Sequence, residues 1–195
     1  MHLGNTEIED TFAEAFRMRW TCVVVTAHDE HWLQAALQAF TGFGTSVIAC
    51  DVEAGVEQYL KPADTPDGRP GASVLMFGFS TSALAEAVPR RAGQCLMTCP
   101  TTAVYNGIND AEEKIALGKH IRYFGDGFQR SKLLAGRRYW RVPVMDGEFL
   151  AEDYVGVAKG VAGGNLIIQA TTLEAVLAAA RRADRKSTRL NSSHS

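Results

Sequence analysis

The alternation of strand-like and helix-like segments is the feature that most restricts the fold of this chain. Strands are expected where β-branched or apolar residues run together, and helices where apolar residues recur every three or four positions. We expect strands at residues 20–27, 46–52, 72–79 and 94–98, and helices at residues 30–40 and 80–88. The resulting order, β-α-β-β-α-β, is that of the split β-α-β or ferredoxin-like arrangement and indicates the α+β class.

Composition excludes several classes of protein. The 195 residues carry 22 acidic and 20 basic side chains, so the chain lacks the basic excess typical of nucleic-acid-binding proteins. Its longest apolar runs, residues 22–27 and 74–79, are far shorter than the roughly 20 residues of a membrane-spanning helix. Acidic residues stand near the N-terminus where a secretory signal would be basic. We therefore expect a cytoplasmic protein that binds neither nucleic acid nor membranes.

No metal site is expected from the sequence. His28 and His31 are three residues apart, but no HExxH or paired CxxC pattern accompanies them. They belong either to a solvent-exposed first helical turn or to a ligand site at the end of a strand. Cys95 and Cys99 are expected to pack as reduced thiols, since no local base accompanies them.

The chain partly repeats its own pattern at a distance of 143 residues. This shift aligns Glu9-Asp10 with Glu152-Asp153, and residues 23–27 with residues 166–170. A helix is expected after the strand in both copies, from residue 172 to about residue 184 in the second. The repeat indicates a second unit of related fold in the last quarter of the chain.

We divide the chain into three parts on this basis. Residues 1–144 are expected to form the first lobe and residues 145–185 the start of a second lobe. Residues 186–195 are polar, with one large apolar side chain, so they bury too little surface to offset the entropy of ordering them. This last part is expected to be a non-native tail.

Four glycine-rich segments carry the most specific information. Glycine beside polar residues suits tight turns and close approach of the backbone to a ligand. The segments are residues 41–46, 65–71, 124–127 and 160–165. Together with residues 7–16 and 93–101, they resemble formylmethanofuran:tetrahydromethanopterin formyltransferases over about residues 1–184.

The resemblance implies an acyltransferase of one-carbon metabolism. It would move a formyl group between methanofuran and N5 of tetrahydromethanopterin, both of them co-substrates, with no tightly bound cofactor. Transfer runs toward the pterin in methanogens and in the opposite direction in methylotrophs. The resemblance further implies two ferredoxin-like lobes, the second truncated here, a homotetramer, and in some members an assembly with hydrolase subunits.

Five residues are candidates for binding substrate. Arg69, in the loop with Asp67, either meets an anionic group of a carrier or belongs to a rigid turn. Thr98 and Thr101 either face a cleft or cap the next segment. Asn165 is the weakest of the five as part of a phosphate loop, because its glycines precede a strand, whereas those of a dinucleotide-binding loop follow one.

Asp126 and Glu148 are the candidate catalytic carboxylates. Transfer of a formyl group between two nitrogens passes through a tetrahedral intermediate, which needs hydrogen-bond donors and a proton carrier. Asp126 is alternatively a turn residue that bonds its own backbone, and Glu148 and Glu152 are alternatively solvated surface groups. The resemblance implies that the principal carboxylate belongs to the later part of the second lobe, so this chain alone is expected to be inactive.

Two other functions compete with formyl transfer. The chain would alternatively be a non-catalytic ferredoxin-like subunit of a formyltransferase/hydrolase assembly. An RNA-binding module is disfavoured, because the chain lacks both the aromatic pattern and the basic charge of such domains.

Overall fold

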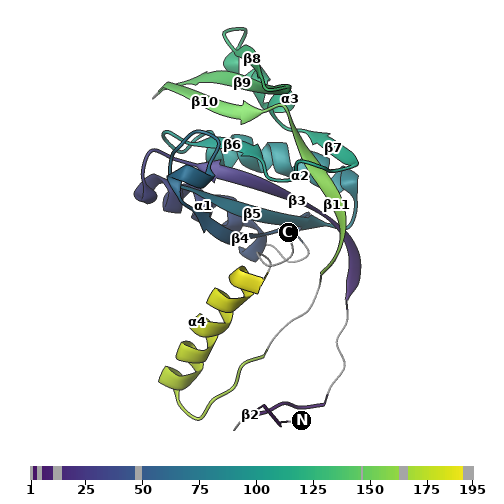
Figure 1. Cartoon of the computed structure of the whole chain (residues 1–195), viewed down its shortest axis with the longest axis vertical. Helices are drawn as coiled ribbons and strands as arrows, with labels where there is room; N and C mark the ends of the chain where they lie inside the picture. The colour runs from purple at the N-terminus through teal and green to yellow at the C-terminus, as the bar shows by residue number, and fades with distance from the viewer. Residues whose placement is uncertain are drawn as a thin grey trace.

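The computed structural model describes residues 2–3, 6–10, 15–46, 50–145, 147–162 and 167–190. Eight strands and two long helices build the main body (Figure 1). In chain order these elements are β3 (Phe16–Thr26), α1 (Glu30–Ser46), β4 (Glu53–Leu60), β5 (Gly71–Gly78), α2 (Thr81–Arg91), β6 (Ala103–Asn106), β8 (Arg130–Leu134), β9 (Arg137–Val144), β10 (Gly147–Glu152) and β11 (Tyr154–Ala162).

The remaining elements are short or lie at the ends of the chain. They are β1 (His2–Leu3), β2 (Thr6–Glu7), η1 (Pro62–Asp64), the π-helical turn η2 (Ala92–Leu96), β7 (Glu113–Ala116), α3 (Gly118–Ile121), η3 (Arg122–Gly125) and α4 (Leu173–Leu190). Strands β1 and β2 pair with each other, and α4 lies below the main body in Figure 1.

A single sheet runs through the main body in the order β4-β5-β3-β6-β10-β9-β8. The first four of these strands pair antiparallel, and β6 pairs parallel with β10 over only two residue pairs, Ala103 with Leu150 and Val104 with Ala151. Strand β11 pairs antiparallel with β7 through its first half and with β3 through its second half. The sheet therefore continues across residue 144, where the sequence analysis divides the two lobes.

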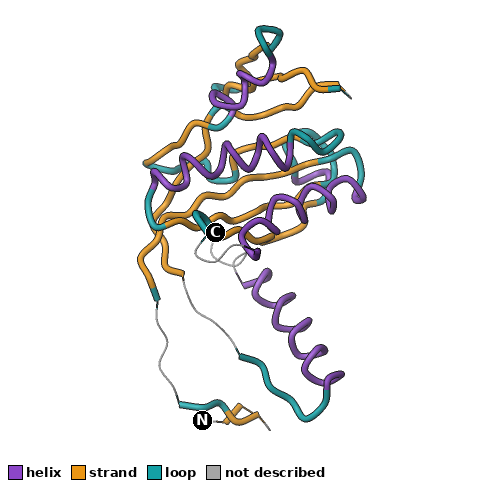
Figure 2. Tube along the Cα trace, turned by 180° about the vertical axis from the view of Figure 1, so that it is seen from behind, coloured by secondary structure: helices purple, strands orange, loops and turns teal. Residues whose placement is uncertain are grey.

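Helices α1 and α2 cover one face of the sheet (Figure 2). Val23 and Val25 alternate with more exposed or polar neighbours on β3 and are fully buried, as are Val74 and Met76 on β5. Phe40 of α1 is fully buried against this surface. The period of two in the strands thus turns one apolar row toward the helices, and the opposite face carries partly exposed apolar side chains such as Val24 and Leu75 beside Thr26.

The expected order of strands and helices is found in residues 16–106, as β3, α1, β4, β5, α2 and β6. The strands expected at 20–27 and 72–79 correspond to β3 and β5. The strand expected at 46–52 is wrong, because residues 50–52 form a loop and β4 begins at Glu53; residues 47–49 lie outside the described residues. Strand β4 shows the alternating burial of a half-buried strand, whereas Val52 is buried as a loop residue that accepts a hydrogen bond from Arg91.

The strand expected at residues 94–98 is also wrong. Helix α2 passes through Pro89, which lacks the amide hydrogen of a regular helix, and continues as η2. The Met97 amide donates to the Ala92 carbonyl at 2.9 Å, closing the wider turn. An apolar run of this length fits either a strand or a buried helix, and here Leu96 is fully buried among the helices.

The glycine segment at residues 41–46 lies in helix α1 and is not a loop. Gly42 and Gly44 weaken a helix relative to alanine, but buried Phe40 just before them anchors this end of α1 to the core. The Thr41 hydroxyl also donates to the Leu37 carbonyl one turn back at 2.8 Å. Tertiary packing therefore outweighs the local preference for a turn.

The second copy of the internal repeat is matched only in its helix. Residues 167–170 have no regular structure, so the strand expected at 166–170 is absent from the described part, and Leu166 lies outside it. The helix expected from residue 172 corresponds to α4, which runs on to Leu190 and so includes residues 186–190 of the expected tail. Among the described residues, no helix is long and apolar enough to cross a membrane.

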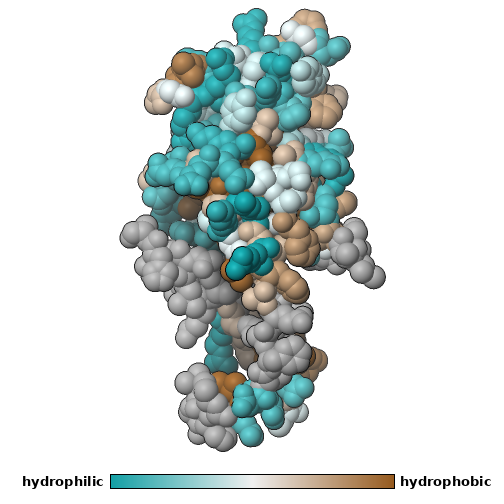
Figure 3. All heavy atoms as spheres, turned by 90° about the vertical axis from the view of Figure 1, so that its right-hand side faces the viewer, coloured by the Kyte–Doolittle hydropathy of each residue, from teal (hydrophilic) through white to brown (hydrophobic). Residues whose placement is uncertain are grey.

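Apolar side chains gather on the side of the molecule where β11 lies, among hydrophilic ones (Figure 3). Phe16, Phe79 and Val161 are exposed at the joined ends of β3, β5 and β11. The rings of Phe16 and Phe79 meet edge to face with centroids 6.3 Å apart. On the N-terminal side of Arg19, β3 pairs only with β11. An exposed aromatic pair therefore lies where the sheet narrows to these two strands.

We predict that Gly156→Ala destabilises the protein, because β11 passes tightly over the loop before β7. A Cβ atom on Gly156 would lie 2.6 Å from the Ala111 Cβ and 2.7 Å from the Ile108 carbonyl oxygen. Urea unfolding should show a loss of about 1–3 kcal/mol, the usual range for overpacking. Gly55→Ala on edge strand β4 is the matched control, since a Cβ there meets nothing within 4 Å. Equal stability of the two variants would contradict this account of the β11 contact.

Candidate functional site

A hydrogen-bonded network centred on Asp67 joins the loop after β4 to strands β3 and β6 of the sheet. One Asp67 oxygen, Oδ2, accepts bonds from the Thr26 hydroxyl at 2.7 Å, the Arg69 Nε at 2.7 Å and the Tyr105 hydroxyl at 2.9 Å. Arg69 in turn donates to the Thr26 hydroxyl and to the Thr101 carbonyl. The loop is thereby fixed to β3, β6 and the turn that precedes β6.

Local sequence explains why the loop folds back at this point. Gly68 adopts a φ of 71°, a left-handed conformation that favours glycine. Gly71 passes so close to the sheet that a Cβ would lie 2.8 Å from the Thr65 methyl and 3.0 Å from the Val25 carbonyl oxygen. The Thr65 hydroxyl donates to the Arg69 carbonyl at 2.7 Å. Glycine and threonine together therefore present Asp67 to its partners.

The hydrogen bonds and burial of this network shift the pKa values of Asp67 and Tyr105 in opposite directions. Burial alone would raise the pKa of Asp67, but hydrogen bonds from Thr26, Arg69 and Tyr105 outweigh it and lower that pKa. Burial, with the Asp67 charge beside it, raises the pKa of Tyr105. Asp67 is therefore ionised and the Tyr105 hydroxyl keeps its proton, so neither group is suited to carry a proton near neutral pH.

A cleft of about 560 Å³ opens beside this network, and we call it the tyrosine cleft. Its walls combine apolar and aromatic side chains with charged groups: Pro66, Asp67, Tyr105, Lys132, Leu134, Ala135, Tyr139, Arg141, Glu148 and Leu150. The rings of Tyr105 and Tyr139 meet edge to face, with centroids 6.2 Å apart. Such walls suit a flat organic ring, with ionic groups available at its edge.

Glu148 lies in this cleft on β10 and pairs with Arg141 on β9. The Arg141 Nε lies 2.6 Å from the Glu148 Oε2, and one terminal nitrogen of Arg141 also contacts that oxygen. About half of each side chain is exposed, so solvent and ligand can reach the pair. Glu148 is therefore more than a solvated surface group, because its side chain also lines a defined cavity.

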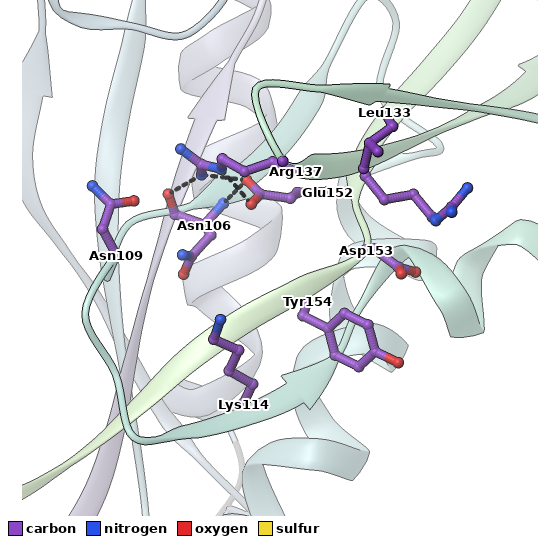
Figure 4. A pocket seen from close by; sticks show the side chains of 10 residues that line it. Asn106, Asn109, Lys114, Leu133, Arg137, Glu152, Asp153 and Tyr154 are labelled. Carbon is purple, nitrogen blue, oxygen red and sulfur yellow. Dashed lines mark hydrogen bonds and ion pairs between the residues drawn. The ribbon is translucent and has the colours of Figure 1, made fainter.

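A second cleft of about 560 Å³, which we call the Lys114 cleft, lies on the other side of the β8–β9 turn. Figure 4 shows its lining side chains, which come from β6 and the loop after it, β7, the β8–β9 hairpin, the end of β10 and the start of β11. The lining residues are Asn106, Asn109, Lys114, Leu133, Gly136, Arg137, Arg138, Glu152, Asp153 and Tyr154.

Glu152 forms the floor of the Lys114 cleft and is 5% exposed. Its carboxylate accepts from the Arg137 Nε at 2.7 Å, the Arg137 Nη2 at 2.5 Å and the Asn106 amide at 2.9 Å. The hydrogen bonds to Glu152 raise the pKa of Arg137. The alternative that Glu152 is a solvated surface group is wrong, because its carboxyl group is buried and hydrogen-bonded to Arg137 and to the Asn106 amide.

The structure brings together four of the seven candidate site residues. Asp67, Arg69 and Thr101 share one network, and Glu148 lines the cleft beside Asp67. Arg69 is engaged within the protein, which favours the structural alternative for this residue. Thr101 has a φ of 66° and its hydroxyl accepts a bond from the His28 amide, so it fixes a turn.

The other three candidates lie elsewhere. The exposed Thr98 bonds to the Gln94 carbonyl of its own helical turn, and Asn165 is outside the described residues. Asp126 ends η3 with a φ of 48° and lines neither cleft, as expected of its turn alternative. Gly125, just before it, leaves no room for a Cβ, which would lie 2.7 Å from the Gln129 Cβ.

The thiols and histidines give no catalytic arrangement within the described ranges. Cys95 and Cys99 are partly buried reduced thiols packed against the core, and the Cys99 thiol donates to the Trp32 carbonyl at 3.6 Å. Burial raises the pKa of Cys22 to about 12, so this thiol is not a nucleophile near neutral pH. His28 and His31 are exposed, and no group of three or more potential metal-ligating side chains occurs among the described residues.

Sequence reasoning missed Tyr105, Tyr139 and the pairing of Arg137 with Glu152. Tyr139 lies in an alternating strand and Glu152 directly follows the apolar residues of β10, so each carries a weak local signal. Their partners lie 34 and 15 residues away, and this juxtaposition is visible only in the fold.

Comparison with protein families matches residues 1–144 to a model described as formylmethanofuran-tetrahydromethanopterin formyltransferase. A second model, described as the proximal lobe of that family, matches residues 147–192. A formylmethanofuran--tetrahydromethanopterin formyltransferase of Methylobacillus flagellatus is 52% identical over 186 residues, which cover 94% of this chain and 62% of the relative. One subunit of the formyltransferase/hydrolase complex of Methylorubrum extorquens is 50% identical over 171 residues, covering 85% of this chain and 55% of that relative.

Solved structures give the same grouping. The formyltransferase from Methanosarcina barkeri superimposes with a TM-score of 0.88 at 42% identity, covering 96% of this chain and 63% of that one. A chain of the Methylorubrum extorquens formyltransferase/hydrolase complex with methylofuran gives a TM-score of 0.84 at 47% identity, covering 92% of this chain and 60% of that one. This chain thus spans about three fifths of the length of the relatives that it matches.

We predict that Asp67→Asn lowers stability at neutral pH and flattens its pH dependence. The substitution keeps the shape but removes the charge that three donors stabilise, which should cost about 1.5–3 kcal/mol. Because the folded pKa of Asp67 lies below its unfolded value, this stabilisation is present above about pH 4 and is lost as the pH falls further. Urea unfolding between about pH 3 and 7 measures both effects.

Asp64→Asn serves as the control, since Asp64 is an exposed residue of η1 in the same loop. Its effect at neutral pH should stay within about 0.5 kcal/mol. A variant at Asp67 that is as stable as this control would show that the network contributes nothing to the loop.

Proposed function

Because this chain belongs to the formylmethanofuran-tetrahydromethanopterin formyltransferase family, we propose that it is part of an enzyme that transfers a formyl group between two one-carbon carriers. The carriers would be a methanofuran and tetrahydromethanopterin, used as co-substrates. The observation that carries this proposal is the agreement of sequence and fold over more than nine tenths of the chain.

We further propose that the tyrosine cleft binds the ring-bearing end of one carrier. Tyr105 and Tyr139 offer aromatic surface, Leu134 and Leu150 apolar walls, and Lys132 a cation at the edge. A formyltransferase/hydrolase complex that contains a relative of this chain was solved with methylofuran, which supports binding of a carrier of this class. The cleft has the volume and mixed lining typical of sites for small organic ligands.

Within this cleft Asp67 acts as a positioning residue, and Glu148 is our candidate for contact with the reacting groups. Attack of an amine on the formyl carbon needs the two groups held close and a proton removed from the attacking nitrogen. Asp67 is held ionised by its partners and fixes the ring of Tyr105. Glu148 is accessible and neutralised by Arg141, which suits orientation of a polar group. The principal proton carrier is expected in the remaining part of the protein.

The finer description of the fold is also a proposal. We infer that β3, α1, β4, β5, α2 and β6 form a ferredoxin-like lobe within residues 1–144, and that residues 145–185 begin a related second lobe. The antiparallel strand order β4-β5-β3-β6 supports the first inference. The separate family models for residues 1–144 and 147–192 support the division.

A second candidate function is that of a non-catalytic subunit in a formyltransferase/hydrolase complex. The 50% identity to a subunit of such a complex favours this possibility. We also propose a cytoplasmic homotetramer, and we expect the 195-residue chain alone to be inactive. Copurification with hydrolase subunits, without transfer activity in the intact gene product, would favour the subunit role over catalysis.

We predict that Tyr139→Ala reduces formyl transfer by the intact gene product at least about tenfold, as expected when ring contact and orientation are lost. The measurement is a spectroscopic assay with both carriers, together with the KM for each. The increase in KM should be confined to the carrier whose ring occupies the cleft.

Tyr59→Ala is the matched control, because Tyr59 is an exposed tyrosine on β4 outside the tyrosine cleft. It should retain wild-type transfer. If the intact gene product neither transfers formyl groups nor binds either carrier, the proposed function is wrong. If the intact gene product transfers formyl groups and Tyr139→Ala transfers them as well as the wild type does, the assignment of the tyrosine cleft is wrong.

A further inference from the structure

We propose that the Lys114 cleft binds an oxyanion, either a carboxylate or a phosphate group, carried by a small molecule. The cleft lies between the β6–β7 segment and the β8–β9 turn, and its volume of about 560 Å³ admits more than a single ion. Figure 4 shows Lys114 rising from β7 toward the part of the cleft where Asn106, Arg137 and Glu152 lie. The inference does not depend on formyl transfer.

The two carboxyl groups of the cleft, those of Glu152 and Asp153, already accept hydrogen bonds from other residues of the protein. Glu152 is nearly buried and accepts three bonds from Arg137 and the Asn106 amide. Asp153 accepts a bond from the Trp140 Nε1 at 2.6 Å. Neither carboxylate pairs with the Lys114 ammonium group, so the positive charge of this lysine is not neutralised by its acidic neighbours.

Several donors of the cleft are available to a ligand. Among the residues that the structure describes, the Lys114 ammonium group makes no hydrogen bond or ion pair, and neither does the side-chain amide of Asn109. Arg137 bonds the protein through Nε and Nη2, which leaves its Nη1 without a hydrogen bond in the same part of the chain. Arg138 adds a further cation, bonded through Nη1 to the Ser131 hydroxyl.

These donors match the acceptors of an oxyanion. An ammonium group, a guanidinium edge and an amide present several N–H groups toward one cavity, and carboxylate or phosphate oxygens accept such bonds strongly. Counting the paired Arg137 and Glu152 as neutral, Lys114 and Arg138 outweigh the single charge of Asp153. Leu133 and Tyr154 provide limited apolar wall, so a charged head group suits this cleft better than a buried ring.

Calorimetric titration of the purified protein with inorganic phosphate and, separately, with glutarate tests this proposal. At low ionic strength and about pH 7.5, where phosphate is mostly the dianion, we expect saturable binding of at least one of the two. Binding of phosphate alone would indicate a phosphate-bearing ligand, and binding of glutarate would indicate a carboxylate. The wild-type protein should lose this binding as salt is added.

Lys114→Gln removes the charge while keeping most of the side chain. It should weaken binding at least about tenfold, because a hydrogen bond to a charged group is lost. Lys159→Gln makes the same change in net charge on exposed β11, outside both clefts, and should alter binding less than twofold. The absence of saturable binding of both anions by the wild type, or equal losses in the two variants, would overturn the proposal.

Discussion

The buried contact of Glu152 with Arg137 and Asn106 is the interaction on which the arrangement of both clefts depends. The strands β8, β9 and β10 join the rest of the sheet through β6, and this junction has only two paired residues on each strand. Glu152 ends β10 and bonds the backbone amide of Asn106 at the end of β6, while Arg137 bonds both Glu152 and the Asn106 carbonyl. The ionic contact therefore completes a junction that the backbone ladder makes only briefly.

This junction explains why two clefts of similar size flank the β8–β9 hairpin. The hairpin supplies Tyr139 to one cleft and Arg137 to the other, and the core sheet supplies Tyr105 and Asn106 to the corresponding opposite walls. Adjacent residues of β6 thus serve different cavities. Each cleft is lined partly by the hairpin and partly by the rest of the sheet. A change in the angle between the hairpin and the sheet would therefore alter both clefts at once.

Much of the fold follows from local pattern, whereas the site follows from distant pairing. The β-branched run around Val23 and the loop around Asp67 are visible in the sequence because each depends on neighbouring residues. The helical turn at Cys95 is not, since its apolar run fits two periodicities and only burial among helices selects one. Arg69 carries the chemistry of an anion-binding residue, yet its partners are Asp67 and the Thr101 carbonyl. Residue type alone does not separate a ligand-binding guanidinium from a structural one.

The path of β11 has a consequence for biosynthesis. Strand β3 pairs along its first residues with β11, so that Arg17 lies opposite Val161 and the Trp20 indole donates to the Lys159 carbonyl. The start of β3 therefore leaves the ribosome long before the strand that completes it. Contacts across such sequence separations form slowly, because the intervening chain must first be ordered. Residues 16–18 of β3 pair with no other strand of the sheet, so they have no strand partner until translation has passed residue 162.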